Sequence, residues 1–536
     1  MHPKRFYLYS LLSGVLLSLA WYEWSTGFVL IIAFVPLLHI EHYYYENKAT
    51  TSPLKILWYV YLSFLIWNFI TNYWIYNATL FGAIAEILLN SLFSAIIFWF
   101  FHLTKRKFGE KIGTIALIAY WIGFEFIYLN GEISHPWLIL GNGFANDIKY
   151  IQWYEYTGTL GGSLWILLLN MILFKVTLAF QKNDFKPIKK QLIFFVSLLL
   201  FPIFLSLILF FNYHETSKPY KTVVIQPNVD PYYEKFDRLT SEEQLNRILK
   251  LAAIKGDSSV DYFVAPETAL TRDISENDID SCDEVLKIKK FLTKYAKAKF
   301  VIGASTFRTL NLTEPVTPTA RKYRDADMYY DCFNTALQID TSGKIQIYHK
   351  SKLVVGVEKV PYPQLFKYIS NLSINLGGAS GSLGTQKHRS VLISPQDGNK
   401  IAPVVCYESI YGEYITEYIE KGAELIFIIT NDGWWLNTSG FKQHFNFSRL
   451  RAIETRRDIA RSANTGRSAF INQRGEAFQS TEWGKQDVIK GIVNANKKKT
   501  FYVRYGDFIG RLCAWTFLVL FCLTIFSSLF FKKEHH

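Results

Sequence analysis

The sequence predicts a polytopic α-helical membrane bundle of eight spans joined to a separate α/β domain. Hydrophobic residues make up 50% of its 536 residues, and charged residues only 19%. Apolar runs long enough to cross a bilayer, about 20 residues each, begin near residues 6, 26, 56, 81, 112, 163, 191 and 508. Between the last two runs, β-rich segments alternate with amphipathic helical segments, a pattern typical of a layered α/β domain.

The order of the runs divides the chain into three parts. Residues 1–212 hold spans one to seven, residues 213–507 form the inserted α/β domain, and residues 508–536 hold the eighth span and a short tail. The first run lacks a small-residue cleavage site, so we expect a retained helix and no signal peptide. Buried helices of a water-soluble protein would be the alternative explanation for some runs, but they would not produce a consistent charge bias in the loops.

Lysine and arginine are distributed unevenly between the short loops. One side carries fourteen of them, at 4–5, 48–55, 105–111, 182–190 and 532–533. The opposite short loops contain only Lys149. Because cationic loops resist translocation, we expect both termini in the cytoplasm and the inserted domain on the outer side of the membrane, which is the periplasm in a Gram-negative envelope. The net charge of +13 is explained by this topology, so we expect no nucleic-acid partner.

The inserted domain contains recognisable strands and helices. We expect strands at 222–228, 261–268, 299–306, 332–340, 344–350, 400–408, 424–432 and 467–475. Amphipathic helices are expected at 241–254, 409–422 and 444–457. Roughly 290 residues can support a complete hydrophobic core.

Cysteine and histidine usage argues against a metal centre or a disulfide scaffold. The five cysteines are irregularly spaced, no C-x-x-C motif occurs, and the eleven histidines are scattered. We therefore expect neither a metal nor a cofactor. Cys282 and Cys332 would lie on the oxidising side of the membrane, and whether they form a disulfide stays open.

Three reactive side chains lie at the ends of apolar strands. Glu267 ends one strand, Lys350 a second and Cys406 a third. A cysteine nucleophile needs a proton acceptor, and an acyl-transfer oxyanion needs positive charge or N–H donors. Each residue alone has a more ordinary interpretation, as a strand-end carboxylate, a solvated lysine or a buried small side chain. Lys352 would share a strand face with Lys350, so spacing alone does not choose between them.

The surroundings of these residues form further motifs. The three segments are Pro266-Glu267-Thr268, Tyr348-x-Lys350-x-x-Leu353-Val354 and Cys406-Tyr407-Glu408. Downstream lie Asn431-Asp432-x-Trp434, Gln443-His444, the run 449–454, Arg457, Asn464 and Gly466. In this order the chain resembles the apolipoprotein N-acyltransferase family, in which a nitrilase-like domain is fused to a membrane bundle. The resemblance covers nearly the whole length and includes bundle segments at 121–125, 136–137 and 152–170.

The resemblance implies a fold and a set of site residues. The inserted domain is expected to be a nitrilase-like αββα sandwich with Glu267, Lys350 and Cys406 as its catalytic triad. Lys350 is preferred to Lys352 because its distances to Leu353-Val354 and Glu358 match the family. Residues implied in support or in substrate binding are Glu358, Tyr407, Glu408, Trp434 and Phe236.

Two segments depart from the family pattern. The usual Leu-Val-Pro-Phe-Gly-Glu after the catalytic lysine is Leu-Val-Val-Gly-Val-Glu here, at 353–358, and the changed residues 355–357 put the loop's conformation in doubt. The usual Asn-Asp-Ala-Trp-Phe-Gly is Asn-Asp-Gly-Trp-Trp-Leu, at 431–436. A family tryptophan near the substrate aligns with Phe236.

The resemblance also implies a reaction. An acyl chain would pass from a membrane phospholipid, expected to be phosphatidylethanolamine, through a thioester on Cys406 to the N-terminal amine of a diacylated apolipoprotein. This two-step route predicts ping-pong kinetics. The alternatives are a membrane-anchored amidase or nitrilase, a non-enzymatic lipid or lipoprotein carrier, and a transporter; the intact triad disfavours the carrier, and the absence of a strong internal repeat disfavours the transporter.

Overall fold

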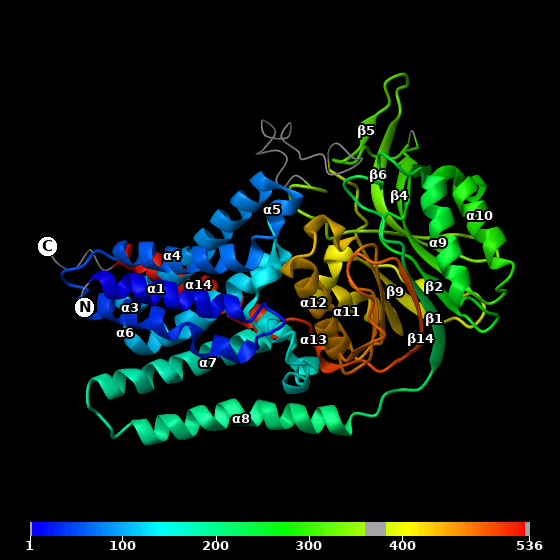
Figure 1. Ribbon diagram of the computed structural model, residues 1–536. Coiled ribbons are helices and arrows are strands. Elements are labelled where there is room, and N and C mark those ends of the chain that lie inside the picture. The colour runs from blue at the N-terminus through cyan, green and yellow to red at the C-terminus, as the bar shows by residue number, and fades with distance from the viewer. Residues whose placement is uncertain (1–2, 312, 360–381, 531–536) are drawn as a thin grey trace. The chain divides into compact units, whose positions relative to one another are not determined.

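The computed structural model describes residues 3–311, 313–359 and 382–530 (Figure 1). The chain forms two compact units. Met1–Asn212 together with Tyr505–His536 make the membrane unit, and Tyr213–Arg504 make the α/β unit.

The membrane unit is entirely helical. Its helices are α1 (Pro3–Leu19), α2 (Leu30–Ala33), α3 (Val35–Glu46), α4 (Lys55–Asn72), α5 (Ile75–Ala78), α6 (Leu80–Asn130), α7 (Tyr154–Gln181), α8 (Ile188–Asn212) and α14 (Phe508–Phe530). Within the described residues, five helical segments are long and apolar enough to cross a membrane: Gly27–Glu46, α6, α7, α8 and Phe508–Phe526. The apolar helices of a membrane protein are therefore present, while the number of eight spans stays a prediction.

Helix α6 contains two of the predicted apolar runs. They meet at Gly109, whose φ of 83° is non-helical and is a conformation that glycine adopts without a steric penalty. This glycine follows the cationic segment 105–107. The helix is therefore interrupted at Gly109, where the sequence predicts a loop between two spans, although both apolar runs belong to α6.

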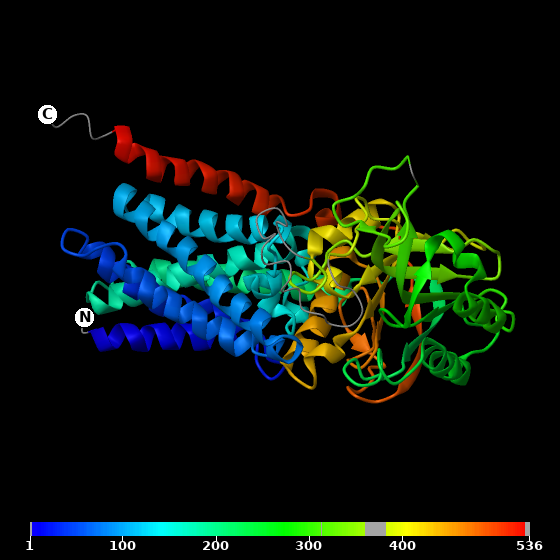
Figure 2. The same cartoon turned by 90° about the horizontal axis from the view of Figure 1, so that it is seen from above.

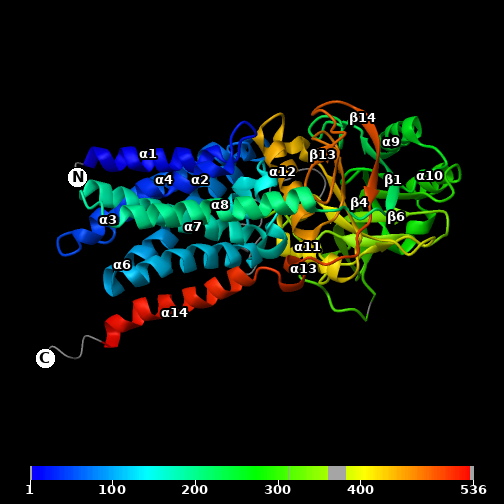
Figure 3. The same ribbon diagram turned by 90° about the horizontal axis from the view of Figure 1, so that it is seen from below.

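Close packing in the membrane unit depends on small residues. Helix α14 lies beside α6 (Figure 2), and a Cβ at Gly123 of α6 would lie only 3.0 Å from the carbonyl oxygen of Cys513. Helices α7 and α8 also run side by side (Figure 3).

Glu125 is buried, and its Oε1 accepts hydrogen bonds from Trp121 Nε1 at 3.1 Å and from Leu140 N at 2.9 Å. A carboxyl group held within the bundle is the expected state of such a residue.

The α/β unit contains two sheets. The first has the order β14-β1-β2-β4-β6-β5, with β3 paired to β4 and β7 to β6. Its strands are β1 (Pro219–Gln226), β2 (Tyr262–Val264), β3 (Leu270–Ser275), β4 (Lys299–Thr309), β5 (Arg321–Lys322), β6 (Tyr329–Ile339), β7 (Gln346–His349) and β14 (Asp487–Asn494). The second has the order β13-β12-β11-β10-β9-β8, with β8 (Leu392–Ile393), β9 (Lys400–Val405), β10 (Leu425–Thr430), β11 (Ile459–Ala463), β12 (Ala469–Ile471) and β13 (Ala477–Phe478).

Helices cover both sheets. On the first sheet, α9 (Ser241–Lys255) packs on β1 and β14, and α10 (Asp283–Leu292) packs on β4. On the second, α11 (Gly412–Glu420) packs on β9 and α12 (Ser439–Thr455) on β12. The two sheets contact each other through β1 and β11. The predicted αββα layering is confirmed.

Local sequence explains where these helices begin and which face they bury. The hydroxyl of Thr240 accepts the N–H of Glu243 at 3.2 Å, and Glu243 Oε2 accepts the N–H of Thr240 at 2.9 Å. This reciprocal cap starts α9. Leu245, Ile248 and Leu251 then recur at helical spacing and enter the core beneath the first sheet.

Strand direction brings the candidate residues to one edge of the sandwich. Strands β1, β2 and β4 are parallel neighbours, as are β9, β10 and β11. Glu267 follows β2, Lys350 follows β7 and Cys406 follows β9. In parallel sheets, the loops after the strands are where ligands bind.

Candidate active site

The predicted triad residues Glu267 and Lys350 are in direct contact. Lys350 is 1% exposed, and its Nζ lies 2.9 Å from Glu267 Oε1 and 2.9 Å from Glu358 Oε1. Asn334 Nδ2, from β6, donates to the same two oxygens at 2.8 and 2.9 Å. One ammonium and one amide therefore fix two carboxylates from separate segments.

The second carboxylate oxygen of Glu267 is also held. Its Oε2 accepts the N–H of Asn431 at 3.1 Å. Burial alone would raise the pKa of Glu267, but the Lys350 ammonium and these hydrogen bonds bring that pKa below its usual value. Burial likewise disfavours the Lys350 cation, yet the charges of Glu267 and Glu358 keep its pKa well above normal. The site at rest holds an ionised glutamate and a charged lysine.

Cys406 occupies a constrained turn. It ends the extended run of β9, has a φ of 49° and begins a short 3-10 helix, η7 (Cys406–Ile410). A non-glycine residue with this left-handed φ is strained, and such strain concentrates at functional sites. The cysteine is 8% exposed. Burial and the charge of Glu267 raise the pKa of its thiol, which Lys350 partly offsets. A neutral thiol near an ionised carboxylate can give up its proton as it attacks.

A cluster of buried polar side chains contacts the Cys406 turn. His444 Nε2 lies 3.2 Å from the carbonyl oxygen of Cys406, and its Nδ1 lies 2.9 Å from Asp432 Oδ1. Arg461 Nη2 donates to Asp432 Oδ2 at 2.8 Å. Thr430 donates to Asp432 Oδ1 at 2.8 Å. Residues from β10, α12 and β11 thus fix the backbone of Cys406.

Glu408 is a scaffold for the same turn. Its buried Oε1 accepts from Tyr348 and Tyr414 hydroxyls, each at 2.6 Å, and from Ser351 N at 2.7 Å. Its Oε2 accepts from Val405 N at 2.9 Å. Glu408 therefore joins the segment after Lys350 to the segment before Cys406. Burial raises the pKa of this carboxyl.

The altered loop at 355–357 keeps Glu358 in place. Gly356, with a φ of 84°, donates its N–H to Lys359 O at 2.8 Å, which closes a tight turn. Glu358 Oε2 accepts the N–H of Val354 at 2.9 Å. The glycine allows the left-handed turn that the changed sequence needs, and the carboxylate still reaches Lys350.

The aromatic residues predicted to support the site lie in two separate ring pairs. Phe236, which is 38% exposed, stacks on half-buried Trp434 with ring centroids 6.5 Å apart. Tyr232 donates to the carbonyl of Trp434 at 2.7 Å. Tyr407 is buried and packs edge-on against Tyr411 at 5.5 Å. Phe236 and Trp434 thus present partly exposed apolar surface.

Several residues of the site were not predicted as site residues. Asn334 lies in the middle of a largely apolar strand. Its polar side chain there was the sequence feature that could have marked it as a site residue. His444 and Asp432 lie within the quoted motifs, but the motifs assign them no role. Lys235, discussed below, precedes Phe236 and carried no signal beyond that neighbour. Lys352 points elsewhere, with its ammonium 4.6 Å from the Tyr411 ring centroid.

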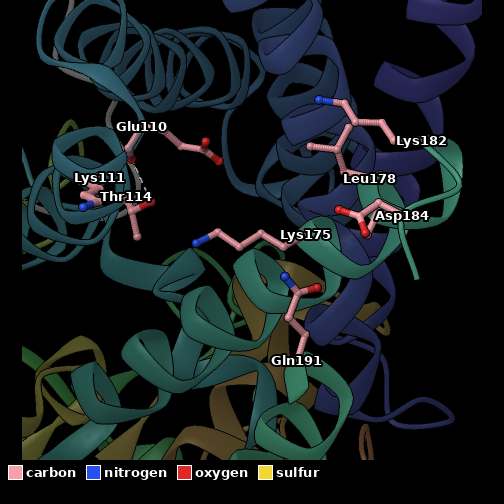
Figure 4. Close-up of a pocket in the computed structure, with 9 residues that line it drawn as sticks. Glu110, Lys111, Thr114, Lys175, Leu178, Lys182, Asp184 and Gln191 are labelled. Carbon is pink, nitrogen blue, oxygen red and sulfur yellow. Dashed lines mark hydrogen bonds between the residues drawn. The ribbon is translucent and has the colours of Figure 1, made fainter. Parts of the chain in front are cut away.

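The described part of the chain holds no metal-ligand cluster and no disulfide, and the membrane unit has pockets of its own. Among those residues, no three histidine, cysteine or acidic side chains gather in a way that could hold a metal ion. Cys282 and Cys332 form no disulfide. The membrane unit contains a pocket of about 360 Å³ (Figure 4), lined by Glu110, Lys111, Thr114, Lys175, Leu178, Ala179, Lys182, Asp184 and Gln191. This lining contains no cysteine or histidine to act as a nucleophile.

Two family models match the chain. The apolipoprotein N-acyltransferase N-terminal domain matches residues 13–172, and the carbon-nitrogen hydrolase domain matches residues 224–498. An apolipoprotein N-acyltransferase of Chlorobaculum tepidum is 29% identical over 524 residues, covering 95% of this chain and 94% of its own. One of Geobacter metallireducens is 28% identical over 532 residues, covering 95% and 94%. These matches confirm the resemblance predicted from the motifs.

A comparison with solved structures gives a further match. A CN-hydrolase superfamily protein of Xanthomonas campestris covers 53% of this chain and 92% of its own, with a TM-score of 0.35 and 15% identity.

Proposed function

Because the chain belongs to the apolipoprotein N-acyltransferase family, with a carbon-nitrogen hydrolase domain after a membrane domain, we propose that it moves an acyl chain from a phospholipid to a lipoprotein amine through Cys406. The observation that carries this proposal is the buried network of Glu267, Lys350 and Glu358 at the strand ends near Cys406. A thiol with a carboxylate base and a cation is suited to acyl transfer.

The first half-reaction loads the enzyme. Glu267 accepts the Sγ proton of Cys406 while sulfur attacks an ester carbonyl of the phospholipid, giving a tetrahedral oxyanion. Lys350 uses two of its three N–H donors on carboxylates, and the third, with the backbone N–H near Tyr407, stabilises that oxyanion. The C–O bond then breaks, Glu267 protonates the departing oxygen, and a lysophospholipid leaves a thioester on Cys406.

The second half-reaction delivers the chain. The free amine of a diacylglyceryl-cysteine attacks the thioester carbonyl, and Glu267 accepts a proton from that nitrogen. The C–S bond breaks, the sulfur regains its proton, and the lipoprotein leaves with a third acyl chain as an amide. The amine can bind after lysophospholipid departs, which gives ping-pong kinetics.

The supporting residues take separate roles in this proposal. Glu358 orients Lys350 through their 2.9 Å contact. Glu408 holds the Cys406 turn, and Tyr407 lines it. Phe236 and Trp434 provide apolar contact for an acyl chain, since both are partly exposed and stacked. Phosphatidylethanolamine is the proposed donor.

Charge asymmetry supports a location for the reaction. Fourteen lysines and arginines on one set of loops, against Lys149 on the other, favour cytoplasmic termini and an α/β unit on the outer side of the inner membrane. A diacylated lipoprotein held in the outer leaflet could then reach the site.

The test is acyl transfer itself. Full-length protein in phosphatidylethanolamine vesicles should convert a diacylated lipopeptide with a free amine to the triacylated form, detected by mass spectrometry as one added acyl chain. Cys406→Ala should give no product. Ammonia release from a small amide, without lipopeptide acylation, would support the membrane-anchored amidase instead.

The same assay tests sidedness. Lipopeptide added to intact spheroplasts should be acylated, whereas inverted vesicles, which enclose the outer face, should leave it unmodified. Equal reaction from the cytoplasmic face would reject the proposed orientation.

A further inference from the structure

A second buried lysine, Lys235, contacts the residue that is proposed as the base. Lys235 is 2% exposed, and its Nζ donates to the main-chain carbonyl of Glu267 at 3.3 Å and to the Thr268 hydroxyl. Lys350 instead binds the Glu267 carboxylate. The two ammonium groups therefore hold different parts of one residue.

The backbone of Lys235 is itself fixed. Its N–H donates to Asp230 O at 2.9 Å, and its carbonyl accepts from Gln244 Nε2 of α9 at 2.6 Å. Gln244 is also buried. The backbone of Lys235 is thus anchored on both sides, and its side chain is buried. These contacts direct its ammonium toward the segment after β2.

That segment is strained at the residue after the base. Thr268 has a φ of 45°, which disfavours a β-branched side chain. The Lys235 ammonium bonds to the carbonyl just before this residue and to its hydroxyl. These bonds hold a strained turn that places Glu267 beside Lys350 and Asn334.

The charge of Lys235 matters as well as its hydrogen bonds. Among the described contacts, its hydrogen-bond acceptors are neutral oxygens, although a buried ammonium usually needs a carboxylate partner. Burial lowers the pKa of Lys235 to about 8, and the charges of Glu267 and Cys406 act to raise it. By reciprocity, a charged Lys235 favours negative charge on those two groups.

We propose that Lys235 is a positioning residue of the catalytic centre, whose ammonium holds the main chain of Glu267 and the hydroxyl of Thr268 and so places the proposed base to take the proton of Cys406. The inference rests on the proposed function only for the assignment of Cys406 as nucleophile. It concerns ionisation of Cys406 and needs no acyl donor or acceptor.

The experiment measures Cys406 directly. The full-length protein is alkylated with iodoacetamide between pH 6 and 10, and the modified Cys406 peptide is quantified by mass spectrometry, which separates it from the other four cysteines. The charged groups around the thiol are Glu267, Lys350 and Asp432, with Glu358 behind Lys350, and Arg461 and His444 behind Asp432. All of these are kept in the variants.

Three substitutions separate charge from shape. Lys235→Met removes the charge and the donors, Lys235→Gln keeps N–H donors without charge, and Lys235→Arg keeps the charge. At pH 7.5, we expect Lys235→Met and Lys235→Gln to slow Cys406 alkylation about tenfold, equivalent to one pKa unit. The pH profiles of both variants should be displaced to higher pH. Arg should remain within about threefold of the parent, because the cation is retained.

Lys299→Met is the matched control. Lys299 is also 2% exposed in the α/β unit, but its ammonium lies over the Tyr262 ring at 5.2 Å, and Asp397, Asp261 and Asp340 are its charged neighbours. The Lys299→Met substitution should leave the pH profile of Cys406 alkylation unchanged.

Parental alkylation profiles in both Lys235→Met and Lys235→Gln would overturn the inference. Equal slowing in Lys235→Met and Lys299→Met would also overturn it, because a general loss of packing would then explain the result. If Lys235→Met does not fold, Lys235→Gln decides alone. Failure of acyl transfer in the parent would reject the proposed function, whereas the alkylation profiles would still answer for Lys235.

Discussion

At the scale of single residues, the proposed base and the proposed nucleophile share a feature. Thr268, next to Glu267, and Cys406 both have a positive φ, and each is contacted by a side chain from another part of the chain. Strain of this kind persists only where surrounding contacts determine it. Glu267 and Cys406 are therefore placed by their neighbours as much as by their own strands.

Lys350 and Lys352 provide a direct contrast between neighbouring cations. Lys350→Met should lower acyl transfer by at least about 100-fold, as loss of an oxyanion donor does. Lys352→Met should stay within about threefold, since its ammonium lies over the Tyr411 ring. Initial rates of lipopeptide acylation measure both. Comparable losses in the two variants would contradict the assignment of Lys350.

The sequence predicted the strand-end positions of the proposed triad better than the residues that contact it. Glu267, Lys350 and Cys406 follow apolar strands, and motif spacing favoured Lys350 over Lys352. Asn334 and Lys235 could not be found in this way, because their importance comes from contacts between segments far apart in the chain. Asn334 reaches Glu267 across 67 residues.

At the scale of elements, the Cys406 turn depends on a cluster drawn from β10, α12 and β11. Asp432 at its centre is fully buried with Arg461 and His444. Burial alone would raise the pKa of Asp432, but Arg461 and His444 hold it at about 2. The ionised carboxylate therefore stabilises the fold fully at pH values above its unfolded pKa, near 3.9, and this contribution is lost as pH falls through about 2.

Asp432→Asn should lower the free energy of unfolding of the α/β unit by about 3–5 kcal/mol, because Arg461 loses its buried counter-charge. Urea unfolding of the full-length protein, followed by fluorescence, measures this change at pH 7. Asp327→Asn is the control, since Asp327 pairs with Lys322 at an exposed position. If both variants unfold like the parent, the cluster does not support the turn.

Element prediction succeeded where a hydrophobic period was clear. The strands around Glu267, Lys350 and Cys406 and the helices α9, α11 and α12 follow the expected segments. Strand β11 was not expected, because its sequence IARSA carries a buried arginine that only the Asp432 cluster accommodates. Strand β14 was not expected either, since DVIKGIVN contains a lysine and a glycine; it pairs with β1 through long-range contacts.

At the scale of the whole molecule, the two units have different physical requirements. The α/β unit has the buried polar network that acyl transfer needs, and the membrane unit has long apolar helices with many exposed large side chains. A small-amide hydrolase would need one anchor at most. A donor and an acceptor that both carry fatty chains give a reason for a helical bundle in the same chain.

The most direct measurement of this central claim is the intact mass of the full-length protein after mixing with phosphatidylethanolamine. We expect a gain of one acyl chain on Cys406 that hydroxylamine removes, and that disappears as added diacylated lipopeptide becomes triacylated. Absence of any adduct in the parent, or the same adduct in Cys406→Ala, would contradict the thioester route.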